Sequence, residues 1–375
     1  MVTMNSKIRL YTDWSVKPYR EAPPSFVLHP FWQQHHSHEI DFKDKSEFRD
    51  MGRFDSISAN WQKYFVYVDK PEQAQWAVLP SDWKYYVWEN ATDLAMQFLD
   101  RMRSKNIMTI VQYNSDDDLP IIGLSNQTLV LRTSFNNSRR QTNEYAMTGF
   151  VGDPLPVYGD GILSVREKSE LPTIGFCGWA NRLCAGEEEL SIFSSLVDNS
   201  FCGVDLQTKY DRIYSFRGKV LELLDSSEGF HTDFTNREGY CAGVDRNNDL
   251  DGLARVRREY YNSIFGSDYV VCVRGKGNYS YRFYEALASG RIPIFINTDS
   301  PLPLPNQIDW RNHCAWVEHK DVSDIAEIVR TFHGSLSQAE FCQMQISNRL
   351  LWEQMLVPEQ YFFRQLKIIE ERGNK

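Results

Sequence analysis

The sequence predicts a protein of the α/β class, built from two domains that each contain a parallel sheet. Segments typical of strands and of helices alternate along most of the chain, as expected when helices cover both faces of such a sheet. Residues 267–296 give the clearest case, because two short apolar segments flank a glycine-containing loop and a helical segment. At 375 residues the chain is also too long for one ordinary hydrophobic core, so two domains are expected.

The first half of the chain predicts an N-terminal domain at residues 1–155. Short apolar runs predict strands at 76–79, 108–113 and 128–131. The segment 92–104 has the spacing of an amphipathic helix, with four apolar residues on one side: Leu94, Phe98, Leu99 and Met102. Residues 150–171 carry glycine, proline and charge without periodicity, which is typical of a segment that links two domains.

The second half predicts a C-terminal domain at residues 172–355. Its expected strands are at 173–177, near 230–234, and at 269–273 and 292–296. Its expected helices are at 212–224, 253–265, 281–289 and 322–335. Two more helices are expected before the end of the chain, and residues 356–375 are expected to pack back on the first domain.

The residues that carry chemistry follow the apolar strand at 269–273. The loop after this strand has two cations and two glycines: Arg274, Gly275, Lys276 and Gly277. Ser280 is a favourable N-cap for the helix that begins at Tyr281. The free N–H groups of a helix start, with Arg282 in the first turn, form an anion site. Glu285 is on the same helix face and could accept hydrogen bonds from two vicinal hydroxyls, such as those of a ribose.

A glycine loop is weak evidence by itself, because an ordinary strand–helix–strand unit with a solvated loop has the same pattern. Two observations favour a ligand site. The cations fall within the loop and the first helical turn, and a polar face persists on a helix between two strands that are expected to be buried. The segment therefore predicts a site for a nucleotide that carries phosphate.

A wider set of motifs surrounds this site. In order along the chain they are Arg274-Gly275, Ser280-Tyr281-Arg282-Phe283-Tyr284-Glu285-Ala286-Leu287, Pro293-Ile294, Leu302-Pro303 and Ile308-Asp309-Trp310. This order resembles the exostosin-like glycosyltransferases, glycosyltransferase family 47. The resemblance is specific over residues 267–320 and diffuse elsewhere. Upstream, the segment 172–178 resembles the strand that opens the family's C-terminal domain, and Arg217 lies where a recurring arginine is expected.

The resemblance implies the GT-B fold, in which two Rossmann-like domains face a central cleft. The C-terminal domain would hold a sugar nucleotide and the N-terminal domain would present the acceptor. It implies an inverting, metal-independent glycosyltransferase that moves a hexosyl or pentosyl group from a nucleoside diphosphate donor, expected to be a UDP-sugar. The acceptor would be a saccharide, in polysaccharide or glycan synthesis. No cofactor and no metal are expected, since fixed cations would stabilise the leaving diphosphate.

The expected donor site consists of ten residues: Gly178, Arg217, Arg274, Gly275, Lys276, Gly277, Ser280, Tyr281, Arg282 and Glu285. Inverting transfer also requires a general base at the acceptor hydroxyl. Asp82, which follows the predicted strand at 76–79, is the candidate for this catalytic role. An exposed loop aspartate is the commoner explanation for a residue in such a place.

Two other functions remain open. Asp116 and Asp118 follow a predicted strand and could hold a metal and a diphosphate in a metal-dependent transferase, although aspartate-rich turns before a proline are common solvated loops. A non-catalytic carbohydrate-binding protein that retains the fold is the other alternative. The segment with His35, His36, His38 and Glu39 is interpreted as polar surface, because no further metal ligands follow at suitable spacing.

Composition restricts the partners. The net charge of −9 argues against a nucleic-acid partner, because binding to a polyanion requires a basic surface. No apolar run approaches the length of a membrane span, and the N-terminus lacks an apolar signal core. The seven cysteines lack metal spacing, which is typical of reduced thiols. A cytoplasmic location is expected. The protein could also attach peripherally to a membrane that carries a glycolipid acceptor.

Overall fold

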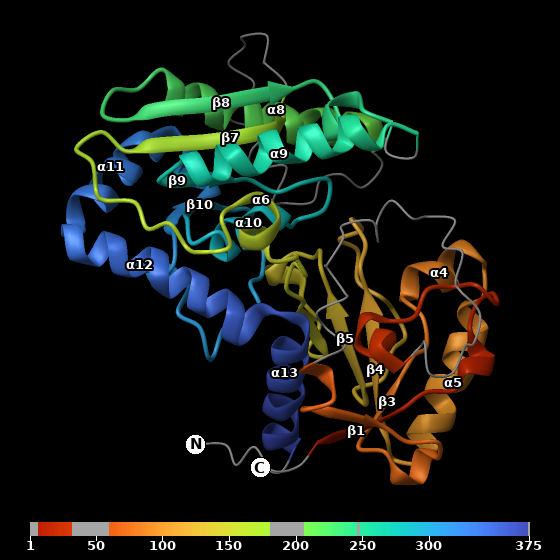
Figure 1. Ribbon diagram of the computed structural model, residues 1–375. Coiled ribbons are helices and arrows are strands. Elements are labelled where there is room, and N and C mark those ends of the chain that lie inside the picture. Colours follow the sequence, from red (N-terminus) through yellow and green to blue (C-terminus); the bar gives the residue numbers. More distant parts are fainter. Residues whose placement is uncertain (1–6, 32–59, 181–205, 246–247, 374–375) are drawn as a thin grey trace. The chain divides into compact units, whose positions relative to one another are not determined.

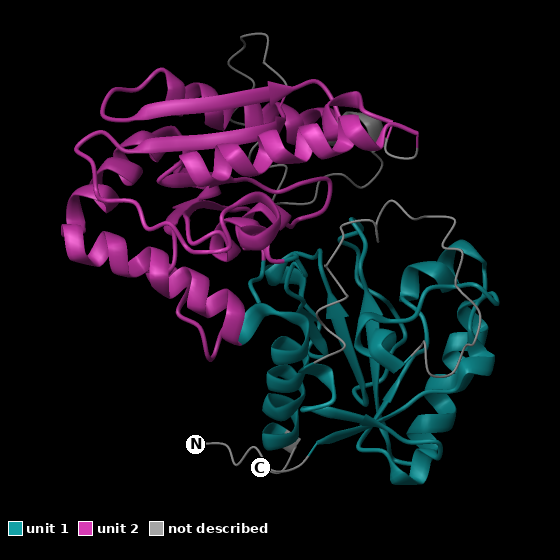
Figure 2. Cartoon of the chain, in the orientation of Figure 1, with its two compact units in different colours: residues 1–152, 301–304, 355–375 teal, residues 153–300, 305–354 magenta. Residues whose placement is uncertain are grey.

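The computed structural model describes residues 7–31, 60–180, 206–245 and 248–373 (Figure 1). The chain divides into two compact units (Figure 2). Unit 1 comprises residues 1–152, 301–304 and 355–375, and unit 2 comprises residues 153–300 and 305–354. Each unit is built around one parallel sheet.

The sheet of unit 1 has six strands in the order β2-β1-β3-β4-β5-β6. Their bounds are β1 Ile8–Tyr11, β2 Phe65–Tyr67, β3 Trp76–Val78, β4 Met108–Tyr113, β5 Thr128–Arg132 and β6 Glu144–Ala146. The helices α4 (Trp83–Trp88) and α5 (Thr92–Ser104) bury their apolar sides against β3, β4 and β5. The helix α13 (Pro358–Gly373) lies on the other side of the sheet, where Phe362 packs against Trp61 and Phe150 (Figure 1).

The sheet of unit 2 has five strands in the order β11-β10-β9-β7-β8. Their bounds are β7 Thr173–Trp179, β8 His231–Arg237, β9 Tyr269–Cys272, β10 Ile292–Asn297 and β11 Ala315–Glu318. The helices are α6 (Pro154–Tyr158), α8 (Leu206–Asp225), α9 (Leu250–Gly266), α10 (Tyr281–Ala288), α11 (Ile325–Ser335) and α12 (Gln338–Leu351). The helices α8 and α9 lie on opposite faces of this sheet (Figure 1). Apolar side chains of α8 and α11 form one continuous core with the strands.

Both sheets confirm the predicted α/β class with two Rossmann-like sheets. In each, the second strand lies on one side of the first and the third strand lies on the other. This reversal places a topological switch point between β1 and β3 in unit 1, and between β7 and β9 in unit 2. Ligands of open α/β sheets bind outside the carboxyl ends of the strands at such points. The central cleft between the domains stays a prediction.

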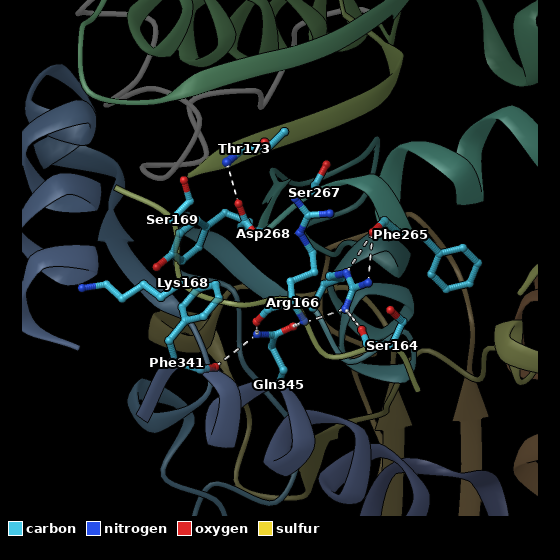
Figure 3. Close-up of polar contacts among 12 residues, drawn as sticks. Ser164, Arg166, Lys168, Ser169, Thr173, Phe265, Ser267, Asp268, Phe341 and Gln345 are labelled. Atoms are coloured by element: carbon cyan, nitrogen blue, oxygen red, sulfur yellow. Dashed lines mark hydrogen bonds and ion pairs between the residues drawn. The ribbon is translucent and has the colours of Figure 1, made fainter. Parts of the chain in front are cut away.

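The segment expected to be a linker, 150–171, is more ordered than predicted. It contains α6, which begins with proline and is capped by the Asp153 side chain. Farther along, Arg166 Nε lies 2.6 Å from Asp268 Oδ1, and Asp268 also accepts a hydrogen bond from Thr173 N (Figure 3). The amide side chain of Gln345 in α12 bonds both the N–H and the carbonyl of Arg166. This part of the segment is therefore fixed to the amino end of the unit 2 sheet.

His333 in α11 belongs to the same end of the sheet. Its Nδ1 lies 2.9 Å from the hydroxyl of Tyr269, and its Nε2 lies 2.8 Å from the carbonyl oxygen of Ser169. The tyrosine hydroxyl donates to Nδ1 and Nε2–H donates to the carbonyl, so the ring is satisfied in its neutral form. Burial lowers the pKa of His333 below its usual value.

This histidine predicts a loss of stability in mild acid. As the pH falls from about 7.5 to about 5.5, the unfolded chain protonates this histidine first, because its pKa is higher there than in the folded protein. The free energy of unfolding should therefore decrease over this range. Thermal unfolding of the wild type and of His333→Gln as a function of pH measures the effect. The variant should show a shallower pH dependence, and parallel curves would contradict the prediction.

Candidate functional site

The candidate site lies at the switch point of unit 2, where β7 and β9 end. After β9 the chain runs through Val273 into the loop 274–280 and then into α10. The end of β7 contributes Gly178 and Trp179. Because all strands of this sheet are parallel, these carboxyl ends meet at one edge.

Two arginines bridge the strand ends. Arg217 reaches over from α8, and its guanidinium donates to the carbonyl of Arg274 at 2.9 Å and to the carbonyl of Trp179 at 3.1 Å. Arg282 in the first turn of α10 donates from Nη2 to the carbonyl of Cys177 at 2.7 Å. Its guanidinium carbon also lies 4.1 Å from the ring centroid of Phe176.

Positive charge accumulates at this point. Burial, reinforced by the charges of Arg282 and Arg274, lowers the pKa of Arg217 to about 10. Within the described parts of the chain, neither Arg217 nor Arg282 forms an ion pair with a carboxylate. The Nε of Arg282 is buried and has no hydrogen-bond partner there. Both arginines are half-buried, and cations that are partly removed from water without a carboxylate partner favour an anionic ligand.

The absence of a side chain at Gly178 leaves room for the guanidinium of Arg282. A Cβ at this position would lie 2.5 Å from Arg282 Nη2, closer than real Cβ contacts come. A Cβ on Gly275 would meet only ordinary contacts, at 3.5 Å from the Tyr279 carbonyl oxygen and 3.6 Å from Arg217 Nη2. The sequence predicted Gly178 as a residue of the donor site. In the structure its missing side chain makes room for a guanidinium.

The loop 274–280 is held by its own hydrogen bonds. The N–H of Gly275 donates to the carbonyl of Tyr279, and the N–H of Tyr279 donates to the carbonyl of Gly277, both at 2.8 Å. The side chain of Asn278 is fully buried and exchanges two hydrogen bonds with Thr298 at the end of β10. Sequence reasoning missed this anchoring role, which an amide residue within a glycine loop could have indicated.

The other predicted loop residues have distinct surroundings. Arg274 is 2% exposed, and its Nη2 lies 3.4 Å from the carbonyl of Lys276, which is half-buried. Ser280 occupies the N-cap position of α10, but its hydroxyl oxygen accepts no capping hydrogen bond. Tyr281 is exposed, and its ring packs edge-on against that of Tyr279.

Glu285 lies one turn after Arg282 in α10. Its two carboxylate oxygens accept hydrogen bonds from Tyr260 at 2.5 Å and from Tyr261 at 3.2 Å. Both tyrosines belong to α9 and were missed from the sequence. The ring of Tyr260 lies 5.5 Å from the guanidinium carbon of Arg282, so it connects the carboxylate with the cationic cluster. The structure thus brings together at one strand edge Gly178, Arg217, Arg274, Gly275, Arg282 and Glu285.

Asp82 lies in unit 1, directly after β3. It is not the exposed loop residue expected on general grounds, because it is only 3% exposed. Its carboxylate caps α4 through Lys84 N and accepts hydrogen bonds from Gln112 Nε2 and Asn114 N, at 2.9 to 3.1 Å. Burial raises its pKa. These contacts give Asp82 a structural role between β3 and β4, and its role as a general base stays a prediction.

The alternative metal ligands Asp116 and Asp118 lie in the segment after β4. Asp117 accepts hydrogen bonds from Tyr113 and from the N–H of Leu119, and its neighbour Asp118 is buried. Among the residues that the structure describes, no three histidine, cysteine or acidic side chains gather as a metal site would require. The segment with His35, His36, His38 and Glu39 lies outside the described residues. No helix within the described ranges has the length and apolar character to cross a membrane.

Comparison with known proteins shows what this domain is similar to. Residues 202–332 match the Exostosin GT47 domain. Exostosin-1 of Drosophila melanogaster is 28% identical over 125 residues, which are 33% of this chain and 16% of that protein. Exostosin-1a of Danio rerio is 26% identical over 125 residues, or 33% of this chain and 17% of that protein.

A plant protein matches over a longer range. The probable beta-1,4-xylosyltransferase IRX10L of Arabidopsis thaliana is 23% identical over 204 residues, which are 54% of this chain and 48% of that protein. The chain therefore spans about half of this relative's length and less than a fifth of the two exostosins. The fold is that of a Rossmann-like domain, with Arg217 and Arg282 gathered at one edge of its sheet. More specifically, residues 202–332 are similar to the exostosin domain of glycosyltransferase family 47.

Proposed function

We propose that this protein is an inverting, metal-independent glycosyltransferase that moves a sugar from a nucleoside diphosphate donor to a saccharide acceptor. The nucleotide of the donor is expected to be UDP. The observation that carries the proposal is the pair Arg217 and Arg282, which are held at the ends of β7 and β9 without a carboxylate partner in the described part of the chain. A diphosphate placed between them would supply the missing negative charge.

The arrangement suits the departure of a nucleoside diphosphate. When the bond between sugar and phosphate breaks, negative charge grows on the leaving phosphate. Cations that are already fixed in a site with little water stabilise this charge without reorganising. Both guanidiniums are fixed by bonds to backbone carbonyls, and the N-terminus of α10 adds a partial positive charge. These groups supply a positive charge that a metal provides in other transferases, which supports a metal-independent reaction.

Glu285 accounts for recognition of the nucleoside part. A carboxylate that already accepts one hydrogen bond on each oxygen retains further lone pairs for two ribose hydroxyls. Inverting displacement requires a base near the acceptor, and Asp82 remains the proposed candidate. Its three hydrogen bonds would have to rearrange for it to take a proton. The cytoplasmic location expected from the cysteines stays a prediction.

Hydrolysis of UDP-, GDP- and CMP-sugars, together with calorimetry of UDP binding, tests the proposal. We expect UDP to bind and one UDP-sugar to be hydrolysed at the same rate with and without EDTA. A rate that EDTA abolishes and a divalent metal restores would favour the metal-dependent transferase with Asp116 and Asp118. Glycan binding without any nucleotide binding would favour the non-catalytic carbohydrate-binding protein. In either case the proposed reaction would be wrong.

A further inference from the structure

Tyr260 contacts both of the side chains that the proposed donor site assigns to different parts of the nucleotide. Its hydroxyl donates to Glu285 Oε2, and its ring faces the guanidinium of Arg282. The same guanidinium also contacts the ring of Phe176, which lies closer to it than the ring of Tyr260 does. The hydroxyl therefore belongs to the expected ribose site, and the ring belongs to the expected diphosphate site.

The neighbouring tyrosine differs in its surroundings. Tyr261 is 4% exposed, and its ring stacks on Tyr158 of α6 at a centroid distance of 4.2 Å. Its hydroxyl is also farther from Glu285, at 3.2 Å against 2.5 Å for Tyr260. Tyr261 thus packs α9 against α6, whereas the contacts of Tyr260 are directed to the candidate site. The two adjacent residues have separable roles.

We propose that Tyr260 is a positioning residue of the donor site, which orients the carboxylate of Glu285 toward the ribose hydroxyls and holds the guanidinium of Arg282 beside it. The inference rests on the proposed function and extends it, because it concerns how the site recognises the ribose hydroxyls of the nucleoside. Tyr260 does not touch the reacting atoms in this scheme. It acts through the two residues that would bind the nucleotide.

The chemistry of the contact fits this role. A phenol O–H can donate to a carboxylate only while it remains protonated, and burial raises the pKa of Tyr260 well above its ordinary value. The hydroxyl is therefore a donor throughout the neutral range, and the carboxylate is the acceptor. A glutamate without this bond could adopt other rotamers, so the geometry required by two vicinal hydroxyls would be lost part of the time. Loss of this bond should therefore weaken the preference for a ribonucleotide over a dideoxynucleotide without abolishing nucleotide binding.

The test compares nucleotides that differ only at the ribose. Calorimetry gives Kd for UDP and for 2′,3′-dideoxy-UDP, with GDP and its dideoxy form measured alongside. The wild type should prefer the ribonucleotide. In Tyr260→Phe, which keeps the ring beside Arg282, the ratio of the two Kd values should fall by about five- to tenfold, as expected when one ordinary hydrogen bond that orients the carboxylate is lost.

Two further variants separate positioning from folding. Tyr269→Phe removes a tyrosine hydroxyl that is buried at the opposite end of the same sheet, where it bonds His333, and it should leave both Kd values unchanged. Glu285→Gln should lower the same ratio. Combining it with Tyr260→Phe should lower the ratio little further, because residues that act through one interaction are not additive.

The possible failures are distinct. An unchanged ratio in Tyr260→Phe or in Glu285→Gln would overturn the inference, whether or not overall affinity falls. Equal affinity of the wild type for ribo- and dideoxynucleotide would overturn it while leaving the proposed transferase intact. If the wild type binds neither UDP nor GDP, the proposed function is wrong and the inference is wrong with it.

Discussion

Replacing Arg282 with alanine should weaken UDP binding by about 10- to 100-fold, because the lost hydrogen bonds to a charged ligand are among the stronger ones in proteins. The effect on kcat should be larger, about 10²- to 10³-fold, as for removal of one fixed group that stabilises charge in a transition state. Calorimetry and donor turnover measure the two effects. Phe176 and the carbonyl of Cys177 hold this guanidinium in place before any ligand arrives, so its contribution requires little reorganisation.

A matched control removes the same charge elsewhere in unit 2. Arg330 in α11 is 39% exposed and pairs with Glu327, so Arg330→Ala should leave affinity and turnover unchanged. Arg282→Lys keeps the charge but loses the planar fork, and it should fall between the alanine variant and the wild type. Full UDP affinity in Arg282→Ala would contradict the assignment of the donor site.

The stability of this variant provides an independent readout. Burial and, after it, the positive charge of Arg282 lower the pKa of Arg217, so Arg282 disfavours the charged form of Arg217 when no anion is present. Removal of Arg282 relieves this repulsion, so the unfolding temperature of the ligand-free protein should not fall. Sites that hold like charges together for function commonly show this trade of stability against activity. A large drop in unfolding temperature would instead indicate that Arg282 serves the fold.

The elements with strong local signals were predicted well. The helix at Thr92–Ser104 has the predicted bounds, and the strand, loop and helix around Arg274 follow the predicted order. In these segments apolar periodicity, glycines and a favourable N-cap all favour the same structure. The three-residue strands β2 and β6 were missed because their stability comes from neighbouring strands rather than from their own sequence.

The candidate site was predictable only where its residues are close in sequence. Arg217 lies 57 residues from the carbonyl that it bonds, and nothing in its own helix indicates that partner; it was found through the family resemblance. Tyr260 and Glu285 are 25 residues apart, and they meet only because the fold brings side chains of α9 and α10 together. The burial of Asp82 was not predicted, because its hydrogen-bond partners Gln112 and Asn114 come from the neighbouring strand and its end.

Gly178→Ala should reduce donor turnover by about 10²-fold, although the substitution adds only one methyl group, since a shift of about 1 Å in a catalytic group can cost that much. The new Cβ would lie 2.5 Å from Arg282 Nη2, so the guanidinium must move away and lose its bond to Cys177. The atom that yields is the end of a flexible side chain, so the fold should persist. The matched control is Gly334→Ala in α11, where a Cβ would meet no atom within 4 Å.

The double variant decides whether Gly178 acts through Arg282. If the glycine serves only to admit the guanidinium, Gly178→Ala should have little effect on turnover in a chain that already carries Arg282→Ala. The coupling between two contacting residues then accounts for nearly the whole effect of the single variant. If instead the two losses multiply, Gly178 has a separate role, such as the close backbone approach to phosphate that its position at the end of β7 suggests. Measuring turnover for all four chains therefore distinguishes a glycine that positions a cation from a glycine that contacts the ligand directly.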